Sequence, residues 1–319
     1  MRLHLCVLYL NSQHKCGLGE FDMSLPNNQG VIPFSVVIPT WQRTAQLRGS
    51  LNRILACQPA PAEIFVHVDA GDPQTVAMLA KEFSGKVRWI ISEKTQGPGG
   101  GRNLLISQAK FPLVACFDDD SWPIDRDFFH TAATLMEEYP QAAVLTGQVT
   151  LREQEVLDVM DLITEINCFE NCACVMRREA FLQTNKYLPL RYAYGMEEAD
   201  VSLQLLDAGW AILKVTRLRV FHDTDLHHHT SAEINASHIT NTALLAFLRY
   251  PVSHWLLGVA QVMNRIRYAL SVGRRSGLLM GIFAIPVAAF RYWQARKPVQ
   301  KSTMFRSRKL ARANSTEAT

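Results

Sequence analysis

Residues 113–121 have the sequence Leu-Val-Ala-Cys-Phe-Asp-Asp-Asp-Ser, in which an apolar run passes directly into three carboxylates. The run 113–117 carries no charge, which favours a strand that is buried in a parallel sheet. In an open α/β sheet, ligands gather outside the carboxyl ends of the strands. The stretch therefore predicts an α/β fold with a polar site at Asp118–Asp120.

Three apolar stretches precede this one, and helical stretches separate them. We expect strands at 34–40, 64–68 and 87–91, and helices at 43–57 and 75–83. This alternation predicts a Rossmann-like, mainly parallel sheet with helices on both faces. The second strand is followed by Asp69, which this topology places at the same edge as the acidic triplet.

Composition and charge divide the chain into segments. With 319 residues, 48% of them hydrophobic and 19% charged, the chain can bury a large core, which excludes wholesale disorder. Residues 1–242 contain 20 Lys and Arg against 28 Asp and Glu, whereas residues 243–319 contain 13 against 1. We predict an N-terminal extension (1–32), an α/β domain (33–235) and a helical, basic C-terminal region (236–319).

The cysteines and the N-terminus favour a reducing compartment. The seven cysteines form no CxxC pair, and their odd number argues against a disulfide framework. Cys168, Cys172 and Cys174 are close in sequence, but we expect buried thiols there rather than a zinc site. The apolar run at 3–10 is not followed by a cleavage site, so we do not expect a signal peptide. Together these features indicate the cytoplasm.

The acidic triplet could belong to either of two kinds of site, a metal site or a helix N-cap. Three adjacent carboxylates repel one another, so a cation is expected beside them. Mg²⁺ and Mn²⁺ prefer oxygen ligands and are usually held by one or two carboxylates together with substrate phosphates. The alternative is a helix N-cap, since residues 119–121 precede Pro123. The position of the triplet at a strand end favours the metal site.

A run of glycines follows the third predicted strand. Residues 97–103 have the sequence Gly-Pro-Gly-Gly-Gly-Arg-Asn and precede a predicted helix at 104–109. The dinucleotide fingerprint is a different pattern, because it follows the first strand as GxGxxG. A glycine loop that enters a helix, with Arg102 beside it, suits the close approach of a phosphate. A flexible turn is the alternative.

Further candidate residues follow later in the chain. Glu197 and Glu198 precede an apolar-periodic helix that ends before Gly209. They suit the helix dipole, and they also suit a carboxylate base. His222 follows a short strand predicted at 218–221, and its neutral imidazole could complete a metal site.

Taken together, these segments resemble family-2 glycosyltransferases of the GT-A fold. The resemblance spans about residues 34–230 and is carried by the order and spacing of 36–40 with Arg43, 68–71, 97–103, 117–120, 195–200 and His222. It implies an inverting enzyme that uses a nucleotide-diphosphate sugar and Mg²⁺ or Mn²⁺.

The resemblance also implies roles for individual residues. Asp69 would contact the base of the nucleotide, and Asp118 would lie near its ribose. The nucleotide-sugar residues correspond to Pro39, Thr40, Arg43, Asp69, Gly97, Arg102, Asn103, Asp118 and Asp119, the metal ligands to Asp120 and His222, and the base to Glu198 or Glu197.

The chain departs from the family pattern at two positions. The acceptor-side motif usually reads Glu-Asp with the Asp as base, so Glu198 takes the place of that Asp and Glu197 precedes it. Because a Glu is longer, either residue is a candidate base. Ala70 stands where a second acid is common.

The C-terminal region combines basic charge with apolar periodicity. Residues 242–313 contain no acid, and apolar side chains from Val252 to Leu270 share one helical face. Residues 276–290 carry no charge but are too few for a membrane span of about 20 residues. An in-plane anchor on anionic lipid fits this pattern, and packing on the catalytic domain is the alternative. The high apolar content argues against nucleic acid.

The sequence therefore predicts an enzyme that transfers a sugar from a nucleotide donor to a saccharide or lipid-linked acceptor at the inner face of the cell membrane. Cell-surface polysaccharide synthesis is the expected setting. A nucleotidyltransferase and a non-catalytic, membrane-bound nucleotide- or sugar-binding module are the alternatives. A nucleotidyltransferase should have a basic, glycine-rich loop directly after the first strand, where this chain has Trp41-Gln42-Arg43.

Overall fold

The fold is built on one mixed β-sheet, described here from a computed structural model that covers residues 31–152, 154–155, 160–224 and 231–317. The predicted extension at 1–32 lies almost wholly outside these residues. Within them, the strand order is β3-β2-β1-β4-β8-β6-β9-β5, with β7 paired to β9. The strands are β1 Val31–Thr40, β2 Ala60–Val68, β3 Arg88–Ile91, β4 Leu113–Cys116, β5 Ser121–Pro123, β6 Ala142–Leu151, β7 Ile163–Glu165, β8 Cys174–Arg177 and β9 Ala211–His222.

The first four strands form the predicted parallel half of the sheet. β1 lies between β2 and β4, and Val36 is in register with Ile64 on one side and Ala115 on the other. Successive side chains of a strand point to opposite faces, so Val36 and Val37 enter different apolar cores. Both are fully buried, which explains why the strand sequence is apolar without alternation.

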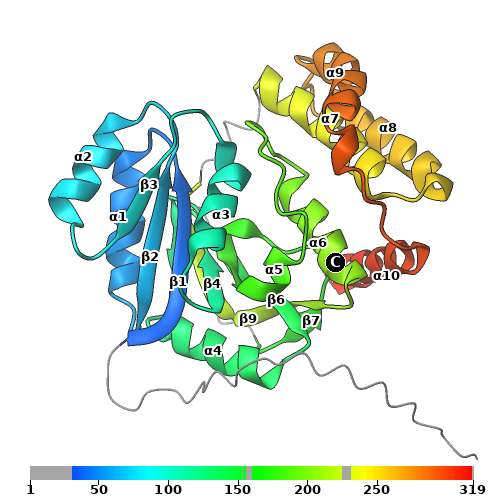
Figure 1. The fold of residues 1–319 in the computed structure, drawn as a ribbon. Helices are drawn as coiled ribbons and strands as arrows, with labels where there is room; N and C mark the ends of the chain where they lie inside the picture. Colours follow the sequence, from blue (N-terminus) through cyan, green and yellow to red (C-terminus); the bar gives the residue numbers. More distant parts are fainter. Residues whose placement is uncertain (1–30, 153, 156–159, 225–230, 318–319) are drawn as a thin grey trace, which may run out of the picture.

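Helices cover both faces of the sheet, which confirms the predicted α/β class (Figure 1). One core packs α1 (Thr44–Leu55), α2 (Pro73–Glu82) and α4 (Phe128–Glu138) against the sheet. The other core involves α3 (Gly97–Gln108), the short α5 (Arg178–Leu182) and α6 (Glu197–Asp207). The two cores place the carboxyl ends of β1, β2 and β4 at one edge between the helix layers.

Three local predictions need correction. The residues from Gly97 onward form the first turns of α3 rather than a loop before it. Residues 121–123 form strand β5 instead of starting a helix, because they pair with β9. The strand predicted at 218–221 is the end of the much longer β9, whose earlier residues pair with β6 and β7.

The C-terminal region lies beside the sheet, with its first three helices grouped together and its last helix apart from them next to α6 (Figure 1). Its helices are α7 Ala232–Arg249, α8 Trp255–Ser271, α9 Leu278–Arg291 and α10 Lys301–Glu317. Apolar residues of α7 and α10 pack with Leu203 of α6, which joins this group to the α/β domain. Among the described residues, no helix combines the length and apolarity that crossing a membrane requires.

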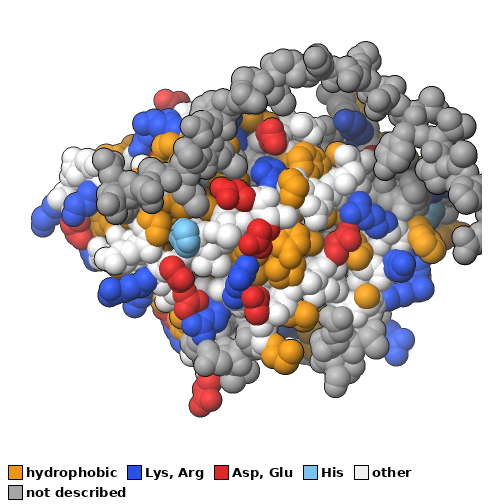
Figure 2. Space-filling model, turned by 90° about the horizontal axis from the view of Figure 1, so that it is seen from below, with side chains coloured by type: hydrophobic (Ala, Val, Ile, Leu, Met, Phe, Trp, Pro, Cys, Tyr) orange, Lys and Arg blue, Asp and Glu red, His pale blue; other side chains and the backbone are white. Residues whose placement is uncertain are grey.

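Surface charge is mixed on the face seen from below in Figure 2. Asp and Glu side chains lie among Lys and Arg side chains there, with apolar patches between them (Figure 2). A surface of alternating sign is typical of a solvated face.

A buried ion pair fastens α7 to α6. Arg249 at the end of α7 donates from Nε and Nη2 to the carboxylate of Asp200, and both side chains are almost fully inaccessible. The same guanidinium donates from Nη1 to the carbonyl oxygens of Ala295 and Lys297, 3.1 and 3.3 Å away. One residue therefore holds the first helix of the basic region, the segment before α10 and the helix that begins with Glu197.

We expect Arg249→Leu to lower the free energy of unfolding by about 3–5 kcal/mol, because the substitution leaves the buried Asp200 carboxylate without its cation. Urea denaturation followed by circular dichroism measures this loss. Arg306→Leu is the matched control, since it removes a partly exposed pair with Glu165 and should cost about 1 kcal/mol or less. Equal losses in the two variants would contradict the anchoring role of Arg249.

Candidate active site

A cavity of about 530 Å³ lies at the carboxyl ends of β1, β2 and β4. The start of α3, the start of α6 and the loop 191–195 complete its wall. The predicted site residues that line it are Pro39, Thr40, Arg43, Asp69, Gly97, Arg102, Asp118, Asp119, Glu197 and Glu198. The topology thus brings together residues that are far apart in sequence.

Asp119 is the member of the acidic triplet that fastens the site to β1 and α1. Its carboxylate accepts a hydrogen bond of 2.7 Å from the Thr40 hydroxyl and pairs with Arg43 at 3.0 Å. Its carbonyl oxygen accepts from the Ser50 hydroxyl at 2.8 Å. Burial raises the pKa of Asp119 to about 7, against the opposing effects of Arg43 and Thr40. Through these contacts, Asp119 stabilises the fold around the cavity.

Asp120 faces the other way, toward Arg43 and His222. Its Oδ2 lies 2.5 Å from Nη2 of Arg43, and its Oδ1 lies 3.1 Å from Nε2 of His222. Burial alone would raise the pKa of Asp120, but the hydrogen bond with His222 and the charge of Arg43 lower it to about 2. The carboxylate is therefore ionised across the physiological range.

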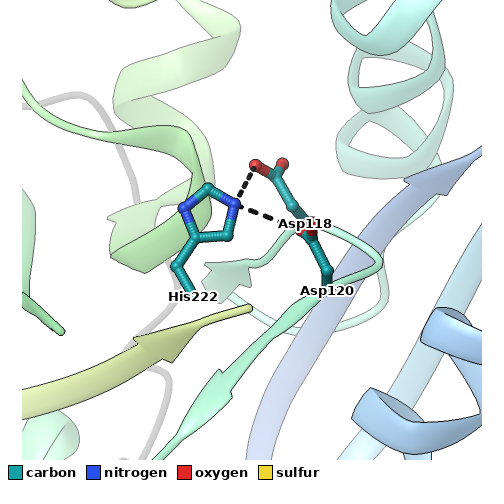
Figure 3. Close-up of side chains that lie close together, drawn as sticks. All are labelled: Asp118, Asp120 and His222. Atoms are coloured by element: carbon teal, nitrogen blue, oxygen red, sulfur yellow. Dashed lines mark ion pairs between the residues drawn. The ribbon is translucent and has the colours of Figure 1, made fainter. Parts of the chain in front are cut away.

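Asp118 joins this group from the cavity wall. It pairs with the fully buried guanidinium of Arg102, and its Oδ2 lies 3.8 Å from Nε2 of His222. Figure 3 shows the imidazole at the end of β9 directed at both carboxylates. Burial lowers the pKa of His222, but the two aspartates outweigh that effect and raise it above the ordinary histidine value.

The pairing of β5 with β9 explains why a histidine so late in the sequence reaches the triplet. Ser121 is in register with His222 across these antiparallel strands. The Ser121 hydroxyl accepts from the backbone N–H of Asp118 and donates to the carbonyl of Cys172, both at 2.8 Å. These bonds turn the chain sharply after β4, so that all three carboxylates stay at the end of the sheet.

Asp118, Asp120 and His222 fit a divalent metal ion. One ligand atom from each lies within 4.8 Å of the others. Oδ1 of Asp120 is buried and faces Nε2 of His222 at 3.1 Å, so these two ligand atoms converge on one position. Two carboxylates and an imidazole suit Mn²⁺ or Mg²⁺, with remaining positions for substrate oxygens. Asp118 thus joins the two residues that the sequence assigned to the metal.

The glycines of α3 allow close packing around the cavity. A Cβ atom at Gly99 would lie 2.3 Å from Oε1 of Glu197, and one at Gly101 would lie 2.4 Å from Nδ1 of His67. Gly97 has a φ of +70°, which other residues rarely adopt. The run is therefore a tightly packed helix start, and the flexible-turn alternative is wrong.

Asp69 holds the start of this helix. Its carboxylate accepts hydrogen bonds from the backbone N–H groups of Ala70, Gln96 and Gly97 at 2.9–3.2 Å. The residue is also part of the cavity wall. The side chain predicted to contact a nucleotide base thus also fixes the backbone of α3.

The two glutamates at the start of α6 differ in environment. Glu197 is buried, lies 3.6 Å from Nη1 of Arg102 and accepts from Nδ2 of Asn171 at 3.4 Å. Burial raises the pKa of Glu197 to about 8 despite the nearby Arg102. Glu198 is only partly buried, and burial likewise raises its pKa above the ordinary glutamate value. Glu198 is the more accessible carboxylate of the pair.

Asn103 does not belong to the cavity wall. Its side chain donates to the carbonyl of Tyr187 at 2.8 Å and accepts from the N–H of the same residue at 3.0 Å. Arg102, its neighbour, does reach the cavity. Asn103 therefore braces the segment before α6 in this structure.

Sequence reasoning missed the loop that covers the other side of the cavity. Arg191, Tyr192 and Tyr194 line the cavity, as does Asn171. The stretch Arg191-Tyr-Ala-Tyr-Gly195 directly precedes the two glutamates, and its two aromatic residues were the available signal. Asn171 carried no signal in the sequence, because it reaches the site through a short 3₁₀ turn at Asn171–Ala173.

Comparison with solved structures identifies the fold. S. aureus TarS 1–349 in complex with UDP-GlcNAc is 18% identical, with 83% of this chain and 82% of that chain covered and a TM-score of 0.58. The mannosyltransferase PcManGT from Pyrobaculum calidifontis, in complex with GDP-Man and Mn²⁺, is 13% identical, with 88% and 84% covered and a TM-score of 0.54. GalNAc-T7 with UDP, GalNAc and Mn²⁺ is 12% identical, with 78% and 59% covered and a TM-score of 0.55.

These structures are GT-A glycosyltransferases, so the predicted fold is confirmed. Comparison with curated proteins gave no match. The model of the family "Glycosyltransferase like family 2" matches residues 32–229, which include every predicted site residue. The chain therefore belongs to the glycosyltransferase-like family 2, as its sequence motifs predicted.

Proposed function

We propose that this glycosyltransferase transfers a sugar, with inversion, from a nucleotide-diphosphate donor to a saccharide or lipid-linked acceptor. One observation carries the proposal: Glu198 and Asp118, a candidate base and a candidate donor-site carboxylate, line the same cavity. The structural neighbours were solved with UDP-GlcNAc, with GDP-Man and Mn²⁺, and with UDP and Mn²⁺, which supports a nucleotide donor here.

The donor would lie over the carboxyl ends of β1 and β2. Pro39, Thr40, Arg43 and Asp69 form that part of the wall and would hold the nucleoside. The diphosphate would extend toward Asp118 and Arg102, whose guanidinium is a fixed cation at the base of the cavity. A diphosphate suits this side of the cavity because two arginines and a helix start face it.

The metal would be Mg²⁺ or Mn²⁺, held by Asp120 and His222 together with Asp118. When bound, it would supply positive charge to stabilise the leaving diphosphate. Arg43 already pairs with Asp119 and Asp120, so the protein contributes a second cation at this edge. Proton transfer from the acceptor is assigned to a side chain of the protein.

Glu198 is the proposed base. As the acceptor hydroxyl attacks the anomeric carbon, Glu198 takes its proton, and the bond to the diphosphate breaks on the opposite face of the sugar. Glu197 is less suited, because Arg102 and Asn171 hold its carboxylate. Glu197 instead positions Arg102 and the start of α6.

We also propose that the catalytic domain, residues 33–235, works at the inner face of the cell membrane. The exposed faces of α8 and α9 carry large apolar side chains, among them Leu256 and Phe283, which are 84% and 72% exposed. Arg265, Arg267 and Arg291 lie on the same two helices. Apolar side chains with arginines around them suit the interface of an anionic membrane. A lipid-linked acceptor in cell-surface polysaccharide synthesis fits this location.

Glu198→Gln should reduce sugar transfer by about two to four orders of magnitude and leave donor binding intact, because an amide cannot accept the proton. Glu197→Gln should retain more activity. Transfer is measured by release of the nucleoside diphosphate, and donor binding by calorimetry. Unchanged turnover in Glu198→Gln would eliminate it as the base, and binding without turnover in the wild type would favour the non-catalytic module.

The pH dependence of transfer provides a second check on Glu198. A base must be deprotonated, and burial raises its pKa, so activity should be lost as the pH falls through a value above the ordinary glutamate range of about 4.3. The residual activity of Glu198→Gln should lack this acid limb. An identical limb in the variant would assign it to another group.

His222→Ala should weaken Mn²⁺ binding by about tenfold or more, because the imidazole is one of three groups that converge on the proposed site. Titration calorimetry of the full chain measures this without a sugar donor. His130→Ala, on the exposed surface of α4, is the matched control and should bind Mn²⁺ like the wild type. Equal binding by wild type and His222→Ala would refute the site.

Phe283→Ser should reduce binding to vesicles of phosphatidylcholine and phosphatidylglycerol by about tenfold, because burial of a Phe side chain contributes about 1.5–3 kcal/mol. Ile91→Ser, an exposed apolar residue on β3, is the control and should bind like the wild type. Co-sedimentation measures both. Failure of the wild type to bind these vesicles would overturn the membrane location.

A further inference from the structure

Helix α7 packs against a loop that forms one wall of the cavity, although the helix begins after the family-matched residues 32–229. The contact is made with the loop 191–195, whose five residues all line the cavity. This loop leads straight into Glu197 and Glu198 at the start of α6. A helix of the basic region therefore stands behind one wall of the site.

Asn241 makes the central contact. The side chain is 4% exposed, and its Nδ2 donates to the carbonyl oxygens of Tyr192 and Tyr194 at 2.9 and 3.1 Å. A single amide group thus uses both of its N–H bonds on one short loop. Removal of the amide would leave the carbonyl groups of Tyr192 and Tyr194 without this partner, and the loop would lose two hydrogen bonds to α7.

His238, one turn earlier on α7, adds a second contact to the same loop. Its ring lies 5.6 Å from that of Tyr194, in a tilted arrangement. The loop ends at Gly195, whose φ of +73° favours glycine, and a Cβ atom there would lie 3.2 Å from Nδ1 of His238. The path of the loop is therefore fixed by α7 on its outer side.

Other side chains of α7 hold α8 and α9. Thr240 donates to the carbonyl of Gly281 in α9 at 2.9 Å. Asn235 donates to the carbonyls of Arg274 and Ser276, in the connection between α8 and α9, at 2.9 and 2.7 Å. Thr240 and Asn241 are thus adjacent on α7, but Thr240 contacts α9 and Asn241 contacts the loop 191–195.

The donor side of the cavity is held by other means. Thr40 and Arg43 both contact Asp119. Arg102 pairs with Asp118, and Asp69 accepts a hydrogen bond from the N–H of Gln96 just before α3. The contacts of α7 with Tyr192 and Tyr194 lie on the opposite wall, beside the glutamates. A disturbance of Asn241 should consequently affect the two substrates differently.

We propose that Asn241 is a positioning residue that holds loop 191–195 as the wall on which the saccharide acceptor binds. The inference rests on the proposed function, in which Glu198 receives the proton of the acceptor hydroxyl. It makes the helical region after residue 230 a part of the acceptor site as well as a membrane anchor.

The test compares Asn241→Leu with Thr240→Val in the full-length chain. Asn241→Leu removes both bonds to the loop, whereas Thr240→Val removes a bond to α9 from the neighbouring position. Hydrogen–deuterium exchange of peptides that cover 190–196 is measured without substrates. Faster exchange of the loop in Asn241→Leu alone is the expected result, and equal exchange in both variants would overturn the proposal.

Kinetics then separate a role in acceptor binding from general damage. The acceptor is taken from a screen of alkyl glycosides with the wild type, and hydrolysis of the donor by water is followed in parallel. Asn241→Leu should raise KM for the glycoside about tenfold, with donor hydrolysis and donor KM unchanged. Asn241→Ser, which keeps a hydroxyl donor in a smaller side chain, should give an intermediate value if Asn241→Leu folds poorly.

A parallel rise of donor KM and acceptor KM in Asn241→Leu would show a merely structural role and overturn the inference. If the wild type transfers no sugar from any common donor, the proposed function fails. Loop exchange then still decides whether Asn241 holds residues 191–195.

Discussion

Mutual repulsion among three adjacent carboxylates at the end of β4, two of them buried, is the constraint on which this edge of the molecule depends. Such a cluster is stable only when cations face it. Each carboxylate pairs with a basic side chain from elsewhere in the chain: Asp118 with Arg102 of α3, Asp119 with Arg43 beside α1, and Asp120 with the same Arg43 and with His222 of β9. These ion pairs therefore connect α3, the start of α1 and β9 to the turn that follows β4.

The same constraint divides the cavity into two sides. Cations and backbone N–H groups around the triplet create a surface suited to a diphosphate. On the opposite side, α6 begins with two glutamates whose pKa values are raised by burial, so a proton acceptor faces an anion-binding wall. Arg102 links the sides, since it pairs with Asp118 and lies 3.6 Å from Glu197. One buried guanidinium thus connects the proposed donor side with the proposed base side.

The sequence predicted the parallel half of the sheet and half of the residues that line the cavity, because both depend on local patterns. Apolar runs mark β1 to β4, and strand ends mark the polar residues. Such local patterns do not predict contacts between segments that are distant in the sequence. The packing of Gly99 on Glu197 and the extension of β9 depend on partners that periodicity does not specify. Asn241 was likewise hidden, since an amide on an apolar helix has no signature until its partners are known.

The pairing of β5 with β9 has a consequence for the newly made chain. Ser121 meets His222 only after some hundred further residues have been synthesised, and contacts of such long sequence separation form late. As β1 to β4 emerge, the acidic triplet can already pair with Arg43 and Arg102, but it lacks the imidazole. The proposed site for a divalent ion is thus complete only when β9 has paired with β5. Metal binding measured at successive times during refolding would report when β9 has paired with β5.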